Sequence, residues 1–551
     1  MQVIRRDLRT LGVVYTPPEV TGPMVARALE PLFEGRTAAQ LAALRICDPA
    51  IGEGAFLLEV VRAIEAALQA RGIADARAIA ARCVCGVDVD ERAVAAAQAA
   101  LGVDAAQLQV ADALAVDWTA AFPDVFAAGG FDAVVGNPPY VRQEHLGDHK
   151  PRLKQFASYD GAADLYVYFV ELAHRLVRPG GRFCLITPNK WLTAGYGRAL
   201  RAHLAAQGSV EGVVDLGRSA LFGDADAFPC IVWGTVRPDG AGAPIQAARL
   251  PAGAAIELGH GAPHARERWQ SDPWHIDAPS ESALIDRLEA RWPSLGDVVP
   301  GAAARGVVTG CNRAFVIDRA TRERLLAEEP AAAAVIRPFI KGRDIKRWLP
   351  TCPERWILLV DRTTSLDALP VTRAHLARFR DALEPRPADH AGAWPGRKPG
   401  SYRWYELQDP VGAQIRARSP RLLYQDIQTA PLCAIDLDGE VVPDTTVWML
   451  PTSDRYLLAV LGSPLYGWYA RRRFPPALNG SVRPKHEYMR RLPIATPSGD
   501  LRAHIVALVE QRLILAKDPT AGDATSLDAA IDRAVHDAYE LSSAEVDQLR
   551  R

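Results

Sequence analysis

The sequence predicts a doubly wound α/β domain, followed by an α+β domain and a helical tail. Three observations carry this prediction. From about residue 45 to 236, short apolar runs of strand type alternate with runs of helical spacing. Beyond about residue 300 this alternation gives way to many short apolar runs, and the tail from about residue 500 has long helical runs. Strands that alternate with helices imply a parallel sheet, with ligands at the carboxyl ends of its strands.

The elements of the first domain follow one another in strand–helix order. The expected strands are 45–50, 83–90, 108–114, 131–140, 182–188, 210–216 and 230–236, and the expected helices are 56–72, 91–102, 164–177 and a run near 194–207. Residues 237–300 are rich in Gly, Pro, Ala and His and lack sustained periodicity, which predicts an edge hairpin and a linker.

A chain of 551 residues exceeds one ordinary core, so more than one domain is expected. We expect a catalytic domain over 1–250, an edge or linker segment over 251–295, a second domain over 296–495 and a helical segment over 496–551. No apolar run reaches the roughly 18 residues that a membrane span needs, and the start has no apolar signal region. The eight cysteines are scattered without a CxxC or Cys/His grouping. These features predict a cytoplasmic protein with reduced thiols, no membrane partner and no metal site.

The net charge of −1 hides an asymmetry along the chain. Residues 301–491 hold 30 Lys and Arg against 20 Asp and Glu, a surplus of about ten positive charges. The basic residues are interleaved with aromatic ones, as in KGRDIKRW and YARRRF. Such a window is often only a solvated surface, but it is also typical of nucleic-acid binding. The candidates for phosphate contact are Lys341, Arg343, Lys346, Arg347, Arg471, Arg472 and Arg473.

The segment DPAIGEGAFL, residues 48–57, places an acid and two glycines between a strand and a helix start. Glycines let a ligand approach the backbone, and the free amides at a helix start favour an electronegative group. The pattern is not GxGxxG, because Phe56 and Leu57 stand where the third glycine would fall. No GK[ST] is present to cradle phosphates, which excludes an ATP-binding P-loop. A tight β–α turn is the purely structural alternative.

Two further strand ends finish in carboxylates, Asp88 in GVDVD and Asp112 in VADAL. Asp88 lies farther from Gly52 than the roughly 20 residues of a dinucleotide-binding fold. It can accept hydrogen bonds from both ribose hydroxyls, and Asp112 can accept one from an adenine amine. Each acid alone is more often a helix N-cap or part of a turn. Together with Asp48 they indicate an adenosine-bearing ligand without a pyrophosphate, and S-adenosylmethionine fits this description.

The next strand end carries the stretch GNPPYV, residues 136–141. Methyl transfer from a sulfonium needs an amine lone pair aimed in line at the methyl carbon. The Asn137 side-chain oxygen and the Pro138 carbonyl would accept hydrogen bonds from an adenine amine and draw its nitrogen towards tetrahedral geometry. Pro138 and Pro139 keep this backbone rigid because their φ angles are fixed. Tyr140 would stack on a base that has been flipped out of a duplex.

These motifs, in this order, resemble those of the gamma-class adenine-N6 DNA methyltransferases of type II restriction-modification systems, the TaqI-like group. The resemblance implies a Rossmann-like, S-adenosylmethionine-dependent methyltransferase sheet and a C-terminal target-recognition domain. VVYTPPEVTGPMV resembles the N-terminal cofactor motif of the family, and LFGDADAFPCIVW (221–233) resembles its target-base motif. The implied cofactor-binding residues are Tyr15, Thr16, Pro17, Asp48, Ala50, Gly52, Gly54, Asp88, Asp112, Ala113 and Phe169, and Phe222 is implied to pack the flipped base opposite Tyr140.

The resemblance extends beyond the catalytic domain, because GVVTGCNRAFVI, IRPFIKGRDIKRW, YQDI and PDTTVWML resemble the recognition region of the same group. It implies double-stranded DNA as substrate, a monomeric enzyme and no metal, with a separate restriction endonuclease considered as a further partner. The cofactor loop departs from the usual DPACGSG, because Ile51 and Glu53 stand here. Since the glycines do the backbone work, we expect cofactor binding to survive, with Glu53 altering contacts at the carboxylate end.

Two other classes stay open at this point. One is another NPPY-bearing amino methyltransferase, acting on cytosine-N4, an RNA base or a protein glutamine. Release-factor enzymes of that kind are much shorter, and cytosine enzymes more often carry Ser in place of Asn137. The other is a non-catalytic DNA-recognition subunit, against which the intact residues 137–140 argue.

Overall fold

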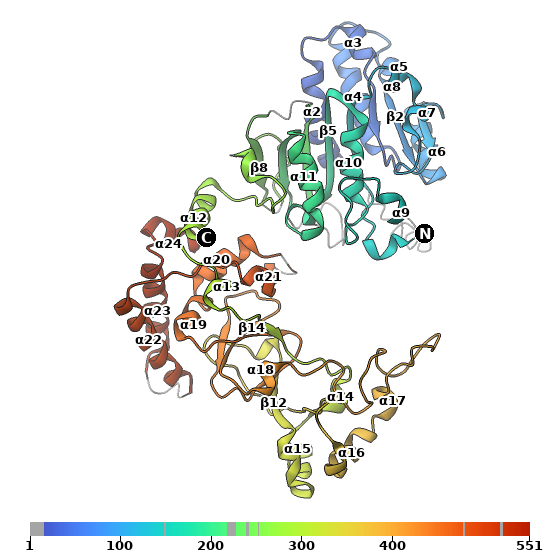
Figure 1. The fold of residues 1–551 in the computed structure, drawn as a ribbon. Coiled ribbons are helices and arrows are strands. Elements are labelled where there is room, and N and C mark those ends of the chain that lie inside the picture. Colours follow the sequence, from blue (N-terminus) through green and yellow to red (C-terminus); the bar gives the residue numbers. More distant parts are fainter. Residues whose placement is uncertain are drawn as a thin grey trace. The chain divides into compact units, whose positions relative to one another are not determined.

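The computed structural model describes residues 16–147, 150–217, 228–237, 242–251, 253–475, 477, 480–517 and 522–550. These residues form two compact units, the first ending at Pro279 and the second beginning at Ser280 (Figure 1). We call them unit 1 and unit 2, and each is described by itself.

Unit 1 is built on a nine-stranded sheet in the order β3-β2-β1-β4-β5-β7-β6-β8-β9. Its strands are β1 (Ile46–Asp48), β2 (Val84–Asp88), β3 (Leu108–Val110), β4 (Phe131–Gly136), β5 (Val177–Pro188), β6 (Val210–Asp215), β7 (Pro229–Thr235), β8 (Ile245–Arg249) and β9 (Ala262–His264). The first five strands pair in parallel, and β7 runs antiparallel between β5 and β6.

Helices cover both faces of this sheet. Successive strand residues point to opposite faces, and both faces carry apolar side chains that must be buried. In β1, for example, Ile46 packs into one hydrophobic core and Cys47 into the other. The first core is completed by α2 (Pro18–Phe33), α3 (Ala38–Ala42), α4 (Ala55–Gln69), α5 (Ala76–Ala81) and α6 (Glu91–Leu101). The second is completed by α7 (Trp118–Ala121), α8 (Pro123–Ala127), α9 (Lys150–Leu153), α10 (Tyr166–Leu176) and α11 (Arg198–Ala206). The predicted doubly wound α/β fold is confirmed.

The strand order reverses between β1 and β4, which are hydrogen-bonded neighbours. From β1 the chain runs outward through β2 and β3, and it then returns to place β4 on the other side of β1. In open α/β sheets ligands bind at such a switch point, outside the carboxyl ends of the strands. Asp48 ends β1 and the GNPPY stretch ends β4, so two of the predicted motifs meet there.

Two details of unit 1 differ from the expectation. Strand β5 begins at Val177, earlier than the expected strand 182–188, and includes the RPGG segment, because Gly180 and Gly181 continue the pairing through Val236. In the region expected to be an edge hairpin and linker, β8 and β9 do pair antiparallel at the edge of the sheet, but the last part of the region forms helix α12 (Pro279–Arg291). This helix buries three large apolar residues, Leu284, Ile285 and Leu288. Because so few apolar residues recur at helical spacing, the periodicity of the sequence does not predict the helix.

Unit 2 contains two four-stranded sheets. One has the order β10-β17-β14-β15, with strands β10 (Ala304–Arg305), β14 (Arg421–Gln425), β15 (Cys433–Asp436) and β17 (Val447–Leu450). The other has the order β11-β13-β12-β16, with strands β11 (Val316–Ile317), β12 (Ile336–Ile340), β13 (Trp356–Leu358) and β16 (Val442–Pro443).

The first of these sheets lies between two cores, since Leu422 and Tyr424 face one and Leu423 faces the other. The core on the Leu423 side is closed by α14 (Asn312–Phe315), α15 (Arg319–Glu328), α16 (Pro370–Ala377), α17 (Arg380–Leu383) and α18 (Ala413–Arg416). The opposite core holds α12, α13 (Leu295–Val298), α19 (Arg455–Leu461), α20 (Pro464–Arg473), α21 (His486–Met489), α22 (Gly499–Lys517), α23 (Ala524–Ala538) and α24 (Ser543–Leu549). The tail is therefore helical, as predicted, and shares a core with the rest of unit 2.

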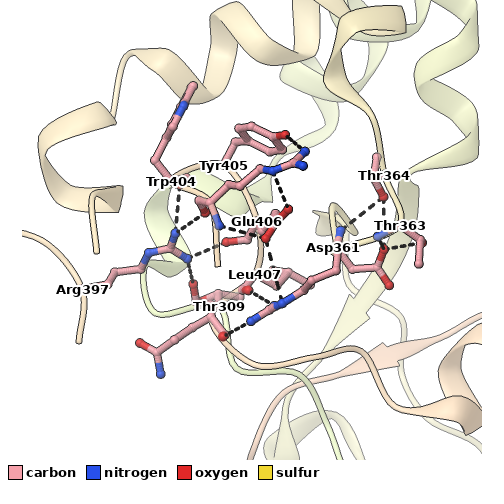
Figure 2. A network of polar contacts seen from close by, with 12 residues as sticks. Thr309, Asp361, Thr363, Thr364, Arg397, Trp404, Tyr405, Glu406 and Leu407 are labelled. Carbon is pink, nitrogen blue, oxygen red and sulfur yellow. Dashed lines mark hydrogen bonds and ion pairs between the residues drawn. The ribbon is translucent and has the colours of Figure 1, made fainter. Parts of the chain in front are cut away.

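A buried arginine organises the segment that follows α17 (Figure 2). Arg397 is 4% exposed and donates hydrogen bonds to five backbone carbonyls, those of Thr309, Leu383, Arg403, Trp404 and Glu406. A planar guanidinium has five N–H donors in a fixed fork, so each of them can be matched. The carbonyl dipoles take the place of an acidic partner for Arg397. The hydrogen bonds from this side chain to backbone carbonyls hold the irregular chain from 384 to 408 in place.

Candidate functional site

The carboxyl ends of β1 and β4 are pressed together at the switch point. A Cβ atom on Gly136 would lie 2.6 Å from Oδ1 of Asp48, a distance that real Cβ contacts do not show. On the other side, a Cβ on Gly86 would lie 2.3 Å from the Asp48 carbonyl oxygen. Glycine is thus required on both neighbouring strands, and the two glycines leave room for a carboxylate at the end of β1.

Asp48 is 1% exposed, and its Oδ1 accepts a hydrogen bond of 2.9 Å from the backbone amide of Ala50. Burial raises the pKa of this carboxyl from 3.8 to about 7, and the nearby Asp88 acts in the same direction, although the Ala50 amide opposes them. A strongly shifted acid at the ligand-binding edge of a sheet is a feature of functional sites.

The glycine-rich turn after β1 is tied to the end of β2. The amide of Gly52 donates to Oδ2 of Asp88 at 2.8 Å, and the other oxygen of Asp88 accepts from the amide of Asp90. Gly54 has a φ of +85° and caps helix α4, and its Cβ would lie 3.1 Å from Cβ of Ala97. Asp88 therefore shapes the turn as well as standing at the predicted ribose position, a role that the sequence reading did not foresee.

The two departures in the turn have different surroundings. Ile51 is buried in the first core of unit 1, where it contributes apolar contacts. Glu53 is exposed. The turn thus keeps its glycine geometry with an aliphatic side chain below it and a free carboxylate on its outer side.

Asp112 follows β3 and is half-buried, with its Oδ1 accepting from the amide of Leu114 at 3.0 Å. Ala113 is buried, and its carbonyl accepts from the indole of Trp118. Between the acids stand two apolar side chains that the sequence reading missed, Val89 at 60% exposure and Val110 at 53%. Val110 is in register with Asp88 across β2 and β3. The detectable signal was a valine one or two positions from an acid at a strand end.

Asn137 is anchored by Thr16, which stands just before helix α2. Its Nδ2 donates a hydrogen bond of 3.0 Å to Oγ1 of Thr16, which is buried. Its Oδ1 is buried and has no hydrogen-bond partner among the described residues. A buried carbonyl oxygen without a donor costs free energy, about 1–3 kcal/mol, so its presence at a strand end points to a ligand that donates there.

Pro138 is buried and Pro139 is half-buried, and within the described part of the chain no donor is bonded to the Pro138 carbonyl. The Tyr140 hydroxyl is also buried without a partner there. Burial raises the pKa of this phenol, so it stays neutral. The Tyr140 ring meets Tyr166 edge-on, with centroids 6.2 Å apart and planes at 70°. One face of the Tyr140 ring is thereby positioned by α10.

The remaining residues proposed from the family resemblance lie in three kinds of place. Pro17 is the N-cap of α2, and Phe169 is buried in α10 at 5% exposure. Tyr15 and Phe222 lie outside the described residues. The structure thus brings Thr16, Asp48 and Asn137 to the switch point and gives each a defined neighbour.

The basic residues singled out in unit 2 divide into two groups. Arg347 pairs with Asp532, Arg472 with Glu281 and Arg473 with Glu289, and each of these three side chains is at most 22% exposed. Arg343, Lys346 and Arg471 are exposed and have no ion-pair partner among the described residues, and Lys341 is half-buried. The first group joins parts of unit 2, whereas the second is free to meet an anionic partner.

Two kinds of feature are absent from the described residues, a metal-binding cluster and a membrane-spanning helix. Within the described ranges there is no group of three or more His, Cys, Asp or Glu side chains that could hold a metal ion. The helices of the described chain are too short or too polar for any of them to cross a membrane.

The chain is similar in sequence to known restriction-modification methyltransferases. Residues 82–222 match the family model of the Eco57I restriction-modification methylase. The chain is 27% identical over 533 residues to the type II methyltransferase M.PaeR7I of Pseudomonas aeruginosa, covering 88% of this chain and 86% of the relative. It is 25% identical over 543 residues to M.XhoI of Xanthomonas vasicola, covering 92% and 94%.

The fold has solved counterparts as well. The type IIL restriction-modification enzyme MmeI, solved in complex with DNA, is similar over 98% of this chain and 75% of its own, with a TM-score of 0.63 and 13% identity. The type ISP enzyme LlaGI, solved with a DNA substrate mimic, matches 93% of this chain and 48% of its own, with a TM-score of 0.51 and 13% identity. The fold is Rossmann-like, as the sequence predicts. More particularly, the predicted resemblance to type II restriction-modification methyltransferases is confirmed over most of the chain.

Proposed function

We propose that the protein is a site-specific DNA methyltransferase that transfers a methyl group from S-adenosylmethionine to the N6 amine of an adenine flipped out of duplex DNA. The observation that carries this proposal is the buried, unpartnered Oδ1 of Asn137 at the switch point of the sheet. An amine N–H is the complement of that oxygen. The similarity to type II methyltransferases supports DNA as the substrate.

The residues at the strand ends fit the proposed cofactor. Asp88 and Asp112 keep acceptor capacity after their amide bonds, since a carboxylate has about four lone-pair positions. Val89 and Val110 are the exposed apolar side chains between them, suited to the faces of a purine ring. Asp48 offers a negative charge to an ammonium group, and that partner would lower the pKa of its carboxyl. When bound, S-adenosylmethionine supplies an electrophilic methyl group on sulfur.

The chain's own residues would orient the acceptor amine. Asn137 Oδ1 and the Pro138 carbonyl accept its two N–H groups, which leaves the nitrogen lone pair pointing away from both. Tyr140 stacks on the base, with its ring held by Tyr166. No side chain needs to remove a proton before the transfer, because the methylated nitrogen becomes acidic and releases its proton afterwards. Rigid positioning is therefore the main contribution of the site.

Unit 2 would supply target recognition. Its exposed cations Arg343, Lys346 and Arg471 are suited to phosphate contacts, which set register on a duplex without reading its sequence. The ion-paired Arg347, Arg472 and Arg473 are better suited to holding the unit together. In a restriction-modification setting the modified site would be the one that a separate endonuclease cleaves.

The proposal is tested by incubating the purified chain with tritiated S-adenosylmethionine and unmethylated genomic DNA, then digesting the product to nucleosides for mass spectrometry. N6-methyldeoxyadenosine is the expected product, and Asn137→Ala should abolish it while cofactor binding persists. N4-methyldeoxycytidine would assign the cytosine reaction instead. In parallel incubations with RNA and with a protein extract, label in those substrates but not in DNA would move the activity to another substrate class, and no transfer to any DNA would refute the proposal.

A further inference from the structure

The carboxyl ends of four strands converge in unit 2. Arg305 ends β10, the turn 341–344 follows β12, the loop 425–428 ends β14, and the turn 444–446 follows β16. The strands come from both sheets of unit 2. We call this place the four-strand corner, defined by Arg305 and these three segments.

Hydrogen bonds between the segments make the corner rigid. The Gly342 amide donates to Oγ1 of Thr446 at 2.7 Å, and Nε2 of Gln425 donates to the Gly342 carbonyl at 2.6 Å. The Asp426 amide donates to the Thr446 carbonyl at 2.8 Å. Three segments that are far apart in sequence thus fix one another, and the backbone of the corner is set before any partner arrives.

Arg305 is the ordered cation of the corner. Its guanidinium donates to the Thr445 carbonyl through Nε and Nη2, and it lies over the Trp448 ring at 5.4 Å. Trp448 is itself fixed, because its indole donates to Oδ1 of Asp426 at 2.9 Å. Asp426 lies 3.7 Å from the guanidinium and its side chain is 15% exposed, whereas Arg305 remains 48% exposed. Among the described residues, Nη1 of Arg305 has no hydrogen-bond partner, so it is free to donate to an external acceptor.

Ile427 follows Asp426 in the loop 425–428, and Asp426 is the acid that lies near the Arg305 guanidinium. Ile427 is 46% exposed, and the other large apolar side chains exposed among the described residues of unit 2 are Val298 and Ile514. A single exposed isoleucine is ordinary on a protein surface. This one follows Asp426, whose backbone and side chain are both bonded within the corner, so its position is fixed as well.

We infer that the four-strand corner contacts base edges of the target duplex, with Arg305 as a guanine-reading side chain and Ile427 as an apolar contact. The inference rests on the proposed function and assigns its sequence specificity to named residues. An arginine fork is the commonest partner of guanine O6 and N7, and aliphatic groups contact thymine methyls or base faces. Because Arg305 is already stacked and bonded, little side-chain entropy is lost on binding. Arg343 and Lys346, exposed on or next to the corner, complement the phosphates.

The experiment begins with long-read detection of methylated bases in a host that expresses the wild-type chain, which yields the recognised sequence. Duplex oligonucleotides carrying that sequence, and single-base variants of it, are then assayed with purified Arg305→Ala and Ile427→Ala. The matched controls are Arg319→Ala, another exposed arginine paired with a carboxylate, and Ile514→Ala, another exposed isoleucine.

Arg305→Ala should lower kcat/KM on the recognised site by about tenfold or more and relax discrimination at one G·C pair. Ile427→Ala should lower kcat/KM on the recognised site by a smaller factor. Both controls should keep wild-type rates, and every variant should keep the wild-type melting temperature. Wild-type rates and unchanged discrimination for Arg305→Ala and Ile427→Ala would overturn the inference and leave the proposed function intact. Equal competition by an RNA hairpin would also overturn it, and a wild-type chain that modifies no DNA would refute both.

Discussion

The side-chain amide of Asn137 is held by the hydroxyl of Thr16, with Nδ2 and Oγ1 3.0 Å apart. The two residues are separated by 121 positions in sequence, and both lie at the switch-point edge of the sheet. Because Nδ2 is the bonded atom, Oδ1 is the atom left without a donor. Thr16, which precedes α2, thus decides which way the side-chain amide of Asn137 faces, and it does so from outside the NPPY motif.

Replacing Thr16 should therefore affect the chemical step. Thr16→Val keeps the shape but removes the acceptor, so Asn137 can rotate, and kcat should fall by about tenfold, corresponding to loss of one hydrogen bond of about 1.4 kcal/mol. Thr16→Ser should restore the rate. Steady-state turnover with saturating cofactor and DNA measures kcat, and isothermal titration measures cofactor affinity separately. A loss confined to cofactor affinity, with kcat unchanged, would contradict the positioning role.

Gly136→Ala should disturb the site through Asp48. The added Cβ would meet Oδ1 at 2.6 Å, and overpacking of this kind costs about 1–3 kcal/mol. The melting temperature and cofactor affinity should both fall. The control is Gly22→Ala, in helix α2, where no atom lies within 4 Å of the added Cβ and stability should hold or rise.

A second variant separates this clash from a backbone effect. Asp48→Ala removes the carboxylate, so Gly136→Ala added to that background should cost less stability than it does in the wild type. Equal costs in the two backgrounds, measured by thermal unfolding, would show that Asp48 is not the cause.

Asp48 should also make stability depend on pH. Its pKa in the folded chain is raised to about 7, above that of an unfolded aspartate near 3.9, mainly because the carboxyl is buried. Between these values the folded state binds more protons than the unfolded state. The free energy of unfolding contributed by this group is therefore greatest below about pH 4 and falls as the pH rises towards 7.

The measurement compares the wild type with Asp48→Asn, without cofactor, by chemical denaturation from pH 4.5 to 8. The wild type should lose a few kcal/mol relative to the variant over this range, since each pKa unit corresponds to about 1.4 kcal/mol. Parallel pH profiles for the two proteins would mean that Asp48 titrates normally in the folded chain.

Arg397→Met should loosen the segment from 384 to 408. The substitution leaves five carbonyl acceptors without their donors, which we expect to cost about 3–5 kcal/mol by analogy with breaking a buried charged network. Arg397→Lys should not restore the segment, because an ammonium has three donors and no planar fork. Limited proteolysis should cut this segment faster in both variants, and a wild-type cleavage pattern would argue against the arginine as its anchor.

The two groups of basic residues should behave differently in DNA binding. Arg343→Gln and Lys346→Gln should each reduce the slope of log affinity against log salt by about 1, because each phosphate contact releases counterions. Arg347→Gln should instead lower the stability of unit 2, since it breaks the pair with Asp532. Fluorescence anisotropy over a salt series measures the slope, and an unchanged slope for both Arg343→Gln and Lys346→Gln would exclude phosphate contact by these two residues.

The sequence by itself determined the class of fold and the order of the motifs. Strand and helix periodicities are local, so the runs from 45 to 236 could be read without knowing their partners. The acids at 48, 88 and 112 and the rigid stretch 137–140 indicated a nucleoside ligand and an amine acceptor, because residue type and strand position were enough for that step. Helix α12 was not predicted from the sequence, since its stripe of buried apolar residues is narrow.

Only the tertiary structure decided which atoms are available. Asn137 could be named from its motif, but the bond that frees its Oδ1 comes from Thr16, and no periodicity links positions 121 residues apart. The same holds for Arg343 and Arg347, four positions apart and alike in charge, of which one is exposed and the other paired with Asp532. Local sequence sets propensity and chemistry, whereas burial and pairing depend on contacts that form when distant segments pack together.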